Sequence, residues 1–115
     1  MSLPQPPHSL DVAGRRLWRS VVGDFDLSES ERSLLALACQ AADDAARARA
    51  ALTASGSVTA RGRYGQPVLH PAVMVARQAE ASVARILGQL HVIDSAEKPA
   101  RRLSTPGPKP LRRLA

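Results

Sequence analysis

The feature that most constrains the fold is a long stretch of alanine and leucine between a start signal and a stop signal for one helix. Ser28 and Glu31 have the spacing of a capping box, in which each side chain binds the backbone N–H of the other residue. Gly56 supplies the left-handed residue that commonly ends a helix. Between them, apolar residues recur at helical spacing, namely Leu34, Leu35, Ala38, Ala41, Ala42, Ala45, Ala46 and Leu52. The pattern predicts a helix over 28–55, about 40 Å long at 1.5 Å per residue.

A shorter helix is predicted before it, over 10–22. Ser9 is the expected N-cap and Gly23 the expected end. One face of this helix is apolar, with Leu10, Ala13, Leu17, Val21 and the edge of Trp18. The opposite face is basic and carries Arg15, Arg16 and Arg19.

The segment 57–71, SVTARGRYGQPVLHP, interrupts the helical pattern. Residues at both of its ends favour strands, and Gly62 and Gly65 permit the positive φ of a tight reversal. We therefore predict a hairpin over about 57–69 with Arg61, Arg63 and Tyr64 at its tip. A two-stranded hairpin is marginal in water, so we expect it to lean on the helices or on a neighbouring subunit.

A third helix is predicted over 71–90. Pro71 fits the first helical position, where its missing N–H removes no hydrogen bond. The expected inward residues are Val73, Ala76, Val83, Leu87 and Leu90. The predicted fold class is thus mainly α, with three helices and a short β-hairpin between the second and the third.

Few large side chains are available for a core. The chain of 115 residues has one Trp, one Tyr and one Phe, whereas twenty residues are Ala. Helices faced with alanine bury little apolar surface each, at roughly 25 cal/mol per Å². We therefore expect a homo-oligomer, in which opposite charges along the second helix, Glu29 and Glu31 against Arg47 and Arg49, would help to align neighbours.

The positive charge is concentrated near the C-terminus. The net charge is +6, and residues 95–115 hold six basic residues against Glu97, or +5, which leaves +1 for the rest. Because this segment is also rich in proline, we expect it to be disordered. The predicted organisation is a flexible N-terminus (1–8), a helical oligomerisation and DNA-binding domain (9–93) and a disordered basic tail (94–115).

The tail contains a near-repeat of two arginines and a leucine. A solubilising tail, a phosphate-binding arm and a peptide that docks on a protein partner all fit this composition. The repeat favours the docking peptide, with the candidate residues Arg101, Arg102, Leu103, Leu111, Arg112, Arg113 and Leu114.

Residues for catalysis or metal binding do not form a recognisable set. Asp43 and Asp44 are adjacent, so a helix points them about 100° apart. The three histidines are widely separated, and Cys39, expected to be a small buried thiol, has no cysteine partner for zinc or for a disulfide. A glycine-rich phosphate loop followed by lysine is missing. We expect no enzyme, no metal and no cofactor.

The chain also lacks the features of a membrane or secreted protein. No apolar run approaches the eighteen or so residues of a membrane span. The N-terminal sequence MSLPQPPHSL has neither the basic start nor the apolar middle of a signal peptide. We expect a soluble protein of the cytoplasm.

Two segments carry a resemblance to a known family: AGRRLWRSVVGDFDLSESERSLLALACQAADDAARARAALTASG and VTARGRYGQPVLHPAVMVARQAEASVARILGQL. Gly14, Trp18, the long helix through Gly56, His70-Pro71 and the final LGQL carry it by their order and spacing. The chain over about 13–93 resembles the small terminase subunits of tailed bacteriophages, specifically the P-twenty-seven-type subgroup. It departs from the family pattern at His91, where glycine is often found, and in the tail.

The resemblance implies a non-catalytic part of a genome-packaging motor. Such subunits form rings, here of eight or more copies, bind viral double-stranded DNA and regulate a large terminase subunit that carries the ATPase and the nuclease. The densest basic clusters outside the tail are the expected DNA-binding residues: Arg15, Arg16, Arg19, Arg61 and Arg63. The large subunit is the expected partner of the tail.

Two other functions fit parts of the sequence. One is a small dimeric DNA-binding transcriptional regulator or antitoxin, in which GDFDLSES would be the corner of a helix-turn-helix. Glu29 and Glu31 speak against it, since a recognition helix usually begins with basic and amide groups. The other is a structural adaptor that binds no DNA. The native mass separates a dimeric regulator from a larger ring.

Overall fold

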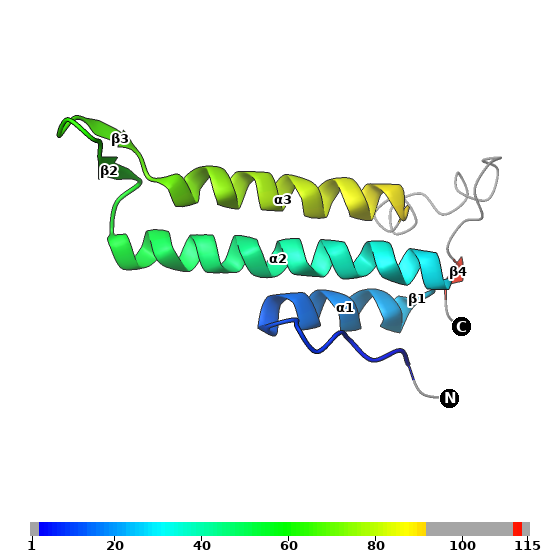
Figure 1. The fold of residues 1–115 in the computed structure, drawn as a ribbon. Helices are drawn as coiled ribbons and strands as arrows, with labels where there is room; N and C mark the ends of the chain where they lie inside the picture. The colour runs from blue at the N-terminus through cyan, green and yellow to red at the C-terminus, as the bar shows by residue number, and fades with distance from the viewer. Residues whose placement is uncertain (1–2, 92–111, 114–115) are drawn as a thin grey trace.

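The computed structural model describes residues 3–91 and 112–113, and most of them are helical (Figure 1). The elements in chain order are α1 (Val12–Asp24), β1 (Phe25–Asp26), α2 (Glu29–Ser55), β2 (Thr59–Arg61), β3 (Pro67–Leu69), α3 (Pro71–Gln89) and β4 (Arg112–Arg113). β2 pairs with β3, and β1 pairs with β4. The predicted mainly α fold, with a hairpin between the second and third helices, is confirmed.

The signals at the two ends of α2 act as predicted. The Glu31 backbone N–H donates to Ser28 Oγ at 3.2 Å, and the Ser28 N–H donates to Glu31 Oε1 at 2.7 Å. At the other end Gly56 adopts φ 74°, and its N–H donates to the Leu52 carbonyl. Both contacts join residues at most four positions apart, which is why sequence alone could predict them.

Both predicted ends of α1 are wrong. The helix begins after Asp11 rather than Ser9, and Asp11 makes no side-chain cap of its own. Gly23 lies inside the helix, since one glycine costs only about 1 kcal/mol in a helix. After Asp24 the chain becomes extended, and alternation then directs Phe25 and Leu27 into the core.

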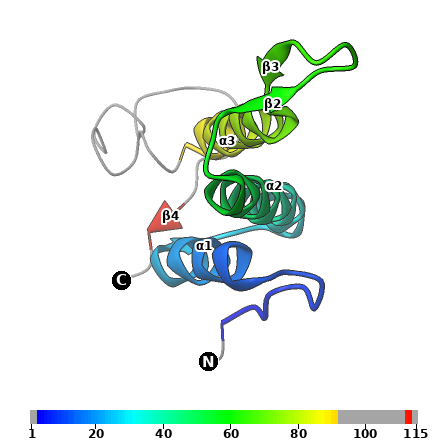
Figure 2. The same cartoon turned by 90° about the vertical axis from the view of Figure 1, so that its left-hand side faces the viewer.

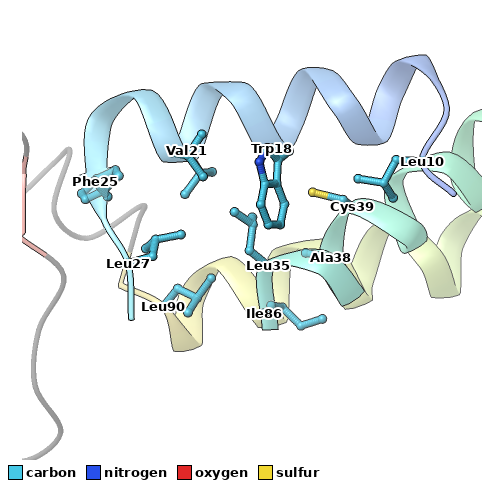
Figure 3. Close-up of a cluster of buried hydrophobic side chains, with 11 residues drawn as sticks. Leu10, Trp18, Val21, Phe25, Leu27, Leu35, Ala38, Cys39, Ile86 and Leu90 are labelled. Carbon is cyan, nitrogen blue, oxygen red and sulfur yellow. The ribbon is translucent and has the colours of Figure 1, made fainter. Parts of the chain in front are cut away.

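The core lies where α1, the N-terminal half of α2 and the C-terminal half of α3 meet. Figure 3 shows Trp18 of α1 pointing toward Leu35 and Cys39 of α2. The cluster comprises Leu10, Trp18, Val21, Val22, Phe25, Leu27, Leu35, Ala38, Cys39, Ile86 and Leu90. The indole Nε1 of Trp18 donates to the Pro4 carbonyl at 3.0 Å, which ties the N-terminal segment to α1.

α2 and α3 form an antiparallel pair that continues beyond α1. Figure 1 shows that α1 lies beside only the N-terminal half of α2, and Figure 2 shows α2 between α1 and α3. Beyond α1 the two long helices meet through small side chains, Ala45 and Ala48 on α2 with Val73, Ala76 and Ala79 on α3. One end of the body is therefore three helices thick and the other only two.

α3 begins as predicted. Pro71 occupies the first turn, and His70 Nδ1 accepts a hydrogen bond from the Ala72 N–H at 3.0 Å. The inward face includes Ile86, which was not among the inward residues predicted from the sequence, whereas Val83 and Leu87 are only half-buried.

The hairpin is antiparallel, with Thr59 opposite Leu69 and Arg61 opposite Pro67. Gly65 adopts φ 83° as expected, but Gly62 does not have a positive φ. Instead, a Cβ at Gly62 would lie 2.7 Å from the Gln66 side chain and 2.9 Å from Val68 Cγ1. Gly62 is thus explained by crowding around its Cα rather than by its backbone conformation.

Within residues 3–91, the hairpin does not pack against the sides of the helices. Figure 1 shows it projecting past the ends of α2 and α3. Its base is closed by the His70 N–H, which donates to the Val58 carbonyl at 2.7 Å. Val58, Tyr64, Val68 and Leu69 are all exposed, with Tyr64 at 85 %. The sequence predicted that the hairpin is supported either by the helices or by a neighbouring subunit. Support by a neighbouring subunit stays a prediction.

Candidate nucleic-acid interface

The three predicted arginines of α1 lie together on its solvent face. Arg15, Arg16 and Arg19 are exposed and, with Val12, line a shallow hollow of about 330 Å³. Arg15 also reaches the His8 carbonyl at 3.5 Å. Within residues 3–91, the ion pairs do not involve these three side chains. Their charges are therefore available to a ligand in solvent.

A buried carboxylate of α2 sets the position of α1. Asp43 is only 3 % exposed, and its two oxygens accept the Asp11 N–H at 2.8 Å and the Gly14 N–H at 2.7 Å. These N–H groups belong to the first turn of α1, where a helix has no partners of its own. A negative charge there also interacts favourably with the helix dipole. Asp43 thus caps α1 from another helix.

Glycine is required where α1 approaches this carboxylate. A Cβ on Gly14 would lie 2.6 Å from Asp43 Oδ2 and 2.7 Å from the Cys39 carbonyl oxygen. Since the second obstacle is backbone, a larger residue would force the two helices apart. The close contact holds the buried side of α1 against α2 and leaves its arginines facing solvent.

The role of Asp43 was missed from the sequence. Its position, four residues after Cys39 and eight after Leu35, continues the buried stripe of α2. A charged residue at a position in phase with a buried stripe is expected to be buried, and a buried charge needs hydrogen-bonding partners. This was the signal in the sequence that could have revealed the role of Asp43.

Cys39 is a buried core residue, as predicted. Burial raises the pKa of its thiol to about 12, and the nearby Asp43 carboxylate acts in the same direction. The thiol therefore stays protonated at neutral pH, where a nucleophile or metal ligand needs the thiolate.

The hairpin arginines form a second, separate cluster. Arg61 and Arg63 are exposed, and the Arg63 guanidinium lies 6.0 Å from the centroid of the Tyr64 ring. Figure 1 shows the hairpin beyond the end of the body that α1 does not reach. The five predicted DNA-binding residues therefore occupy two places in one chain rather than a single patch.

Arg47 and Arg49 of α2 form ion pairs within the chain, so the structure does not leave their charges for a neighbouring subunit. Arg47 contacts Asp44 at 2.6 Å and Asp11 at 3.3 Å. Arg49 makes a two-pronged contact with Glu80 of α3, at 3.0 and 2.8 Å. These hydrogen bonds raise the pKa of Arg49 and lower that of Glu80.

Exposed apolar side chains lie on α3 and the hairpin at the two-helix end. A hollow of about 310 Å³ lies along α2 and α3, lined by Asp44, Arg47, Ala48, Ala72 and Val75. Val75 and Met74 of α3 are about half exposed, as is Leu69 of the hairpin. We call this area, together with the exposed hairpin side chains, the distal apolar surface.

Most of the predicted tail residues lie outside the described part of the chain: Arg101, Arg102, Leu103, Leu111 and Leu114. Arg112 and Arg113 are described, as strand β4. β4 runs antiparallel to β1, with Arg113 opposite Phe25 and Arg112 opposite Asp26. This pairing was not predicted from the sequence.

Neither a metal site nor a membrane span emerges from the described residues. Across 3–91 and 112–113, no group of three His, Cys, Asp or Glu side chains could hold a metal ion. In the same part of the chain, no helix has the length and hydropathy needed to cross a bilayer.

Comparison with known proteins identifies the family. Searches of curated proteins and of solved structures gave no significant match. A family model described as "Phage terminase, small subunit" matches residues 14–102, which include all three helices and the hairpin. That match covers the family as a whole and leaves the P-twenty-seven-type subgroup a prediction. The chain belongs to the phage terminase small subunit family, which supports a role in phage genome packaging.

Proposed function

We propose that this protein is a non-catalytic small terminase subunit that binds viral double-stranded DNA as a homo-oligomeric ring. In that role it regulates the ATPase and nuclease of the large terminase subunit during packaging. The observation that carries the proposal is the family match over 14–102. Two features of the fold support it: an arginine face on α1 that is open to solvent, and a distal apolar surface beyond the three-helix core.

Self-association is supported by the contrast between the exposed hairpin and the buried core. Tyr64 is an exposed aromatic residue in the same hairpin as exposed Val68 and Leu69. Aromatic side chains are frequent anchors of protein interfaces. In the proposed ring, the hairpin of one subunit packs on the α2–α3 part of the distal apolar surface of the next, around Ala48, Ala72 and Val75. Such a head-to-tail contact generates a closed ring when its rotation closes.

DNA binding is assigned to the α1 arginines, with the hairpin arginines as a second contact. Guanidinium groups bind phosphate oxygens irrespective of sequence. A ring would repeat the α1 face once per subunit, so weak individual contacts would add along the DNA. The expected binding is therefore sensitive to salt, because each phosphate contact releases counterions.

A charge-matched pair of variants tests this assignment. Arg15→Ala with Arg19→Ala removes two charges from the α1 face. Arg77→Ala with Arg85→Ala removes two from exposed positions of α3. In a mobility-shift titration, the α1 variant should bind duplex DNA more weakly, with its salt slope reduced by about one for each phosphate that it no longer binds. The α3 variant should bind as wild type does. Equal weakening in both variants would mean that only total charge matters and would refute the site.

Native mass measures the assembly and separates the competing functions. A ring of eight or more subunits is expected at micromolar concentration by native mass spectrometry. A dimer would favour a transcriptional regulator or antitoxin, and a monomer would contradict self-association altogether.

The tail is proposed to dock on the large subunit through its leucines as well as its arginines. Apolar burial distinguishes a protein groove from phosphate, which makes no use of leucine. Leu111→Ala with Leu114→Ala should weaken stimulation of the large subunit's ATPase and leave DNA affinity unchanged. A variant that stimulates fully but binds DNA poorly would show that the tail acts as an electrostatic arm.

A further inference from the structure

A narrow stripe of exposed residues runs along the solvent face of α1. Val12, Arg16, Arg19 and Gly23 lie within about 60° of one another around the axis, at about 100° per residue. All four are exposed. The buried face of α1 lies on the opposite side, toward α2 (Figure 2). We call these four residues the α1 stripe.

Val12 begins the stripe and is 74 % exposed. Single exposed apolar residues are common on protein surfaces, so exposure alone carries little information. Val12, however, lines the same hollow as Arg15, Arg16 and Arg19. An apolar group among guanidinium groups matches the major groove of DNA, which offers phosphate oxygens along its walls and the methyl groups of thymine inside.

Gly23 ends the stripe, and nothing in the described part of the chain requires glycine there. Its φ is not positive, and a Cβ on Gly23 would meet no atom within 4 Å. Gly14, in contrast, is required by crowding against Asp43 and Cys39. Glycine weakens a helix relative to alanine, but it lets another molecule approach the backbone closely. Gly23 thus leaves this end of the stripe open to a close contact.

The acidic residues near α1 lie off the stripe. Asp11 and Asp24 stand at the two ends of the helix, each about 80° around the axis from the nearest residue of the stripe. Asp11 is also paired with Arg47. Asp26 follows in β1, beyond the end of the helix. Arg15 lies closer to the stripe than Asp11 does, on the same side. The face that α1 presents to solvent is therefore positive.

The dimensions of α1 suit the major groove. A helix with its side chains is about 10–12 Å across, and the groove is about 12 Å wide. The stripe rises about 16 Å from Val12 to Gly23, at 1.5 Å per residue. α1 is also an outer helix of the body, with α2 on one side of it (Figure 2).

We infer that α1 is seated in the major groove of double-stranded DNA, with Val12 against thymine methyl groups and Gly23 against the wall of the groove. Val12 then sets a sequence preference, whereas the arginines hold the helix in place through phosphates. This inference rests on the proposed binding of DNA by the α1 arginines and adds the reading of bases to it.

Removing methyl groups from both partners tests the contact of Val12. A duplex is first selected for tight binding from a library with a random centre, and is then prepared with uracil in place of thymine. The wild-type protein should bind the thymine form about three- to fivefold more tightly for each methyl group that Val12 buries. Val12→Ala should bind both forms equally, with an unchanged salt slope. Leu37→Ala, which truncates an exposed apolar residue of α2, should keep the preference. A preference retained in Val12→Ala would overturn the contact.

A matched pair of glycine variants tests the close approach. Gly23→Ala should leave the melting temperature level or raise it, since the new methyl group meets nothing within the described residues. It should nevertheless weaken binding to the selected duplex by about fivefold or more, because the methyl group takes space that DNA occupies. Gly88→Ala is the control, at an exposed position of α3 that is equally uncrowded. Equal affinity of the two variants would overturn the seating of α1.

The outcome for the wild-type protein separates this inference from the proposed function. If every duplex in the library bound equally well, the reading of bases would be refuted and the proposed DNA binding would stand. If no duplex bound at all, the proposed function would fail together with the inference.

Discussion

At the end of the body that holds α1, three helices enclose Trp18, Leu35 and their neighbours, and the side chains there are almost fully buried. At the other end, α2 and α3 meet through alanines and leave Val75 and the hairpin exposed. The first end has the large side chains that stabilise a monomer. The second has a surface suited to a neighbour. Stability and assembly are therefore expected to respond to different substitutions.

The largest effect is expected from truncating the core of the three-helix end. Leu35→Ala removes a side chain with no exposed surface and should cost about 2–5 kcal/mol in the free energy of unfolding. Leu52→Ala, a half-buried position on the two-helix part of α2, is the matched control and should cost clearly less. Urea denaturation of both variants measures the difference. Similar costs would mean that the two ends are equally important for stability.

A smaller but still large effect is expected where α1 docks on α2. Asp43→Ala leaves two buried or partly buried N–H groups without their acceptor and should cost about 1–3 kcal/mol. Asp44→Ala, next along the same helix but exposed, should cost about 0.5 kcal/mol or less. Thermal unfolding compares the two variants. If they unfolded at the same temperature, Asp43 would not be the cap of α1.

At the two-helix end, substitutions should affect self-association rather than the stability of the monomer. Tyr64→Ala with Leu69→Ala should change monomer stability little, since both side chains are exposed, but weaken self-association by about tenfold or more. Leu37→Ala is the control, because Leu37 is 54 % exposed on the part of α2 that carries the core. Sedimentation across a concentration series measures the self-association of both variants. An unchanged oligomer in the hairpin variant would remove the hairpin from the proposed interface.

The smallest effect concerns the ion pair that joins α2 to α3. The hydrogen bond from Arg49 lowers the pKa of Glu80, so the pair contributes stability above the ordinary pKa of a glutamate, and this is lost as pH falls through the lowered value. Both groups are exposed, so the effect of Glu80→Gln on the melting temperature should be small and should fade in high salt. The variant and wild type should converge at a pH below the lowered pKa of Glu80, where its carboxyl is protonated in both the folded and the unfolded chain. A difference in melting temperature that persists at this low pH would have a cause other than the Arg49–Glu80 ion pair.

Prediction from sequence succeeded best where the interacting groups are near neighbours in the chain. The capping box of Ser28, the stop at Gly56 and the start at Pro71 all follow from residues a few positions apart. The candidate site was only partly predictable. The arginine face of α1 follows from helical spacing, but its separation from Arg61 and Arg63 depends on how far α2 extends beyond α1.

The sequence by itself determined the three helices, the hairpin and the basic clusters, because spacing and local hydrogen bonds act within about a turn. Only the tertiary structure decided where α1 begins, since its cap is Asp43, some thirty residues away along the chain. The same holds for β1 and β4, whose pairing joins distant segments. A strand edge accepts many sequences through its backbone groups, so side-chain patterns alone cannot identify its partner.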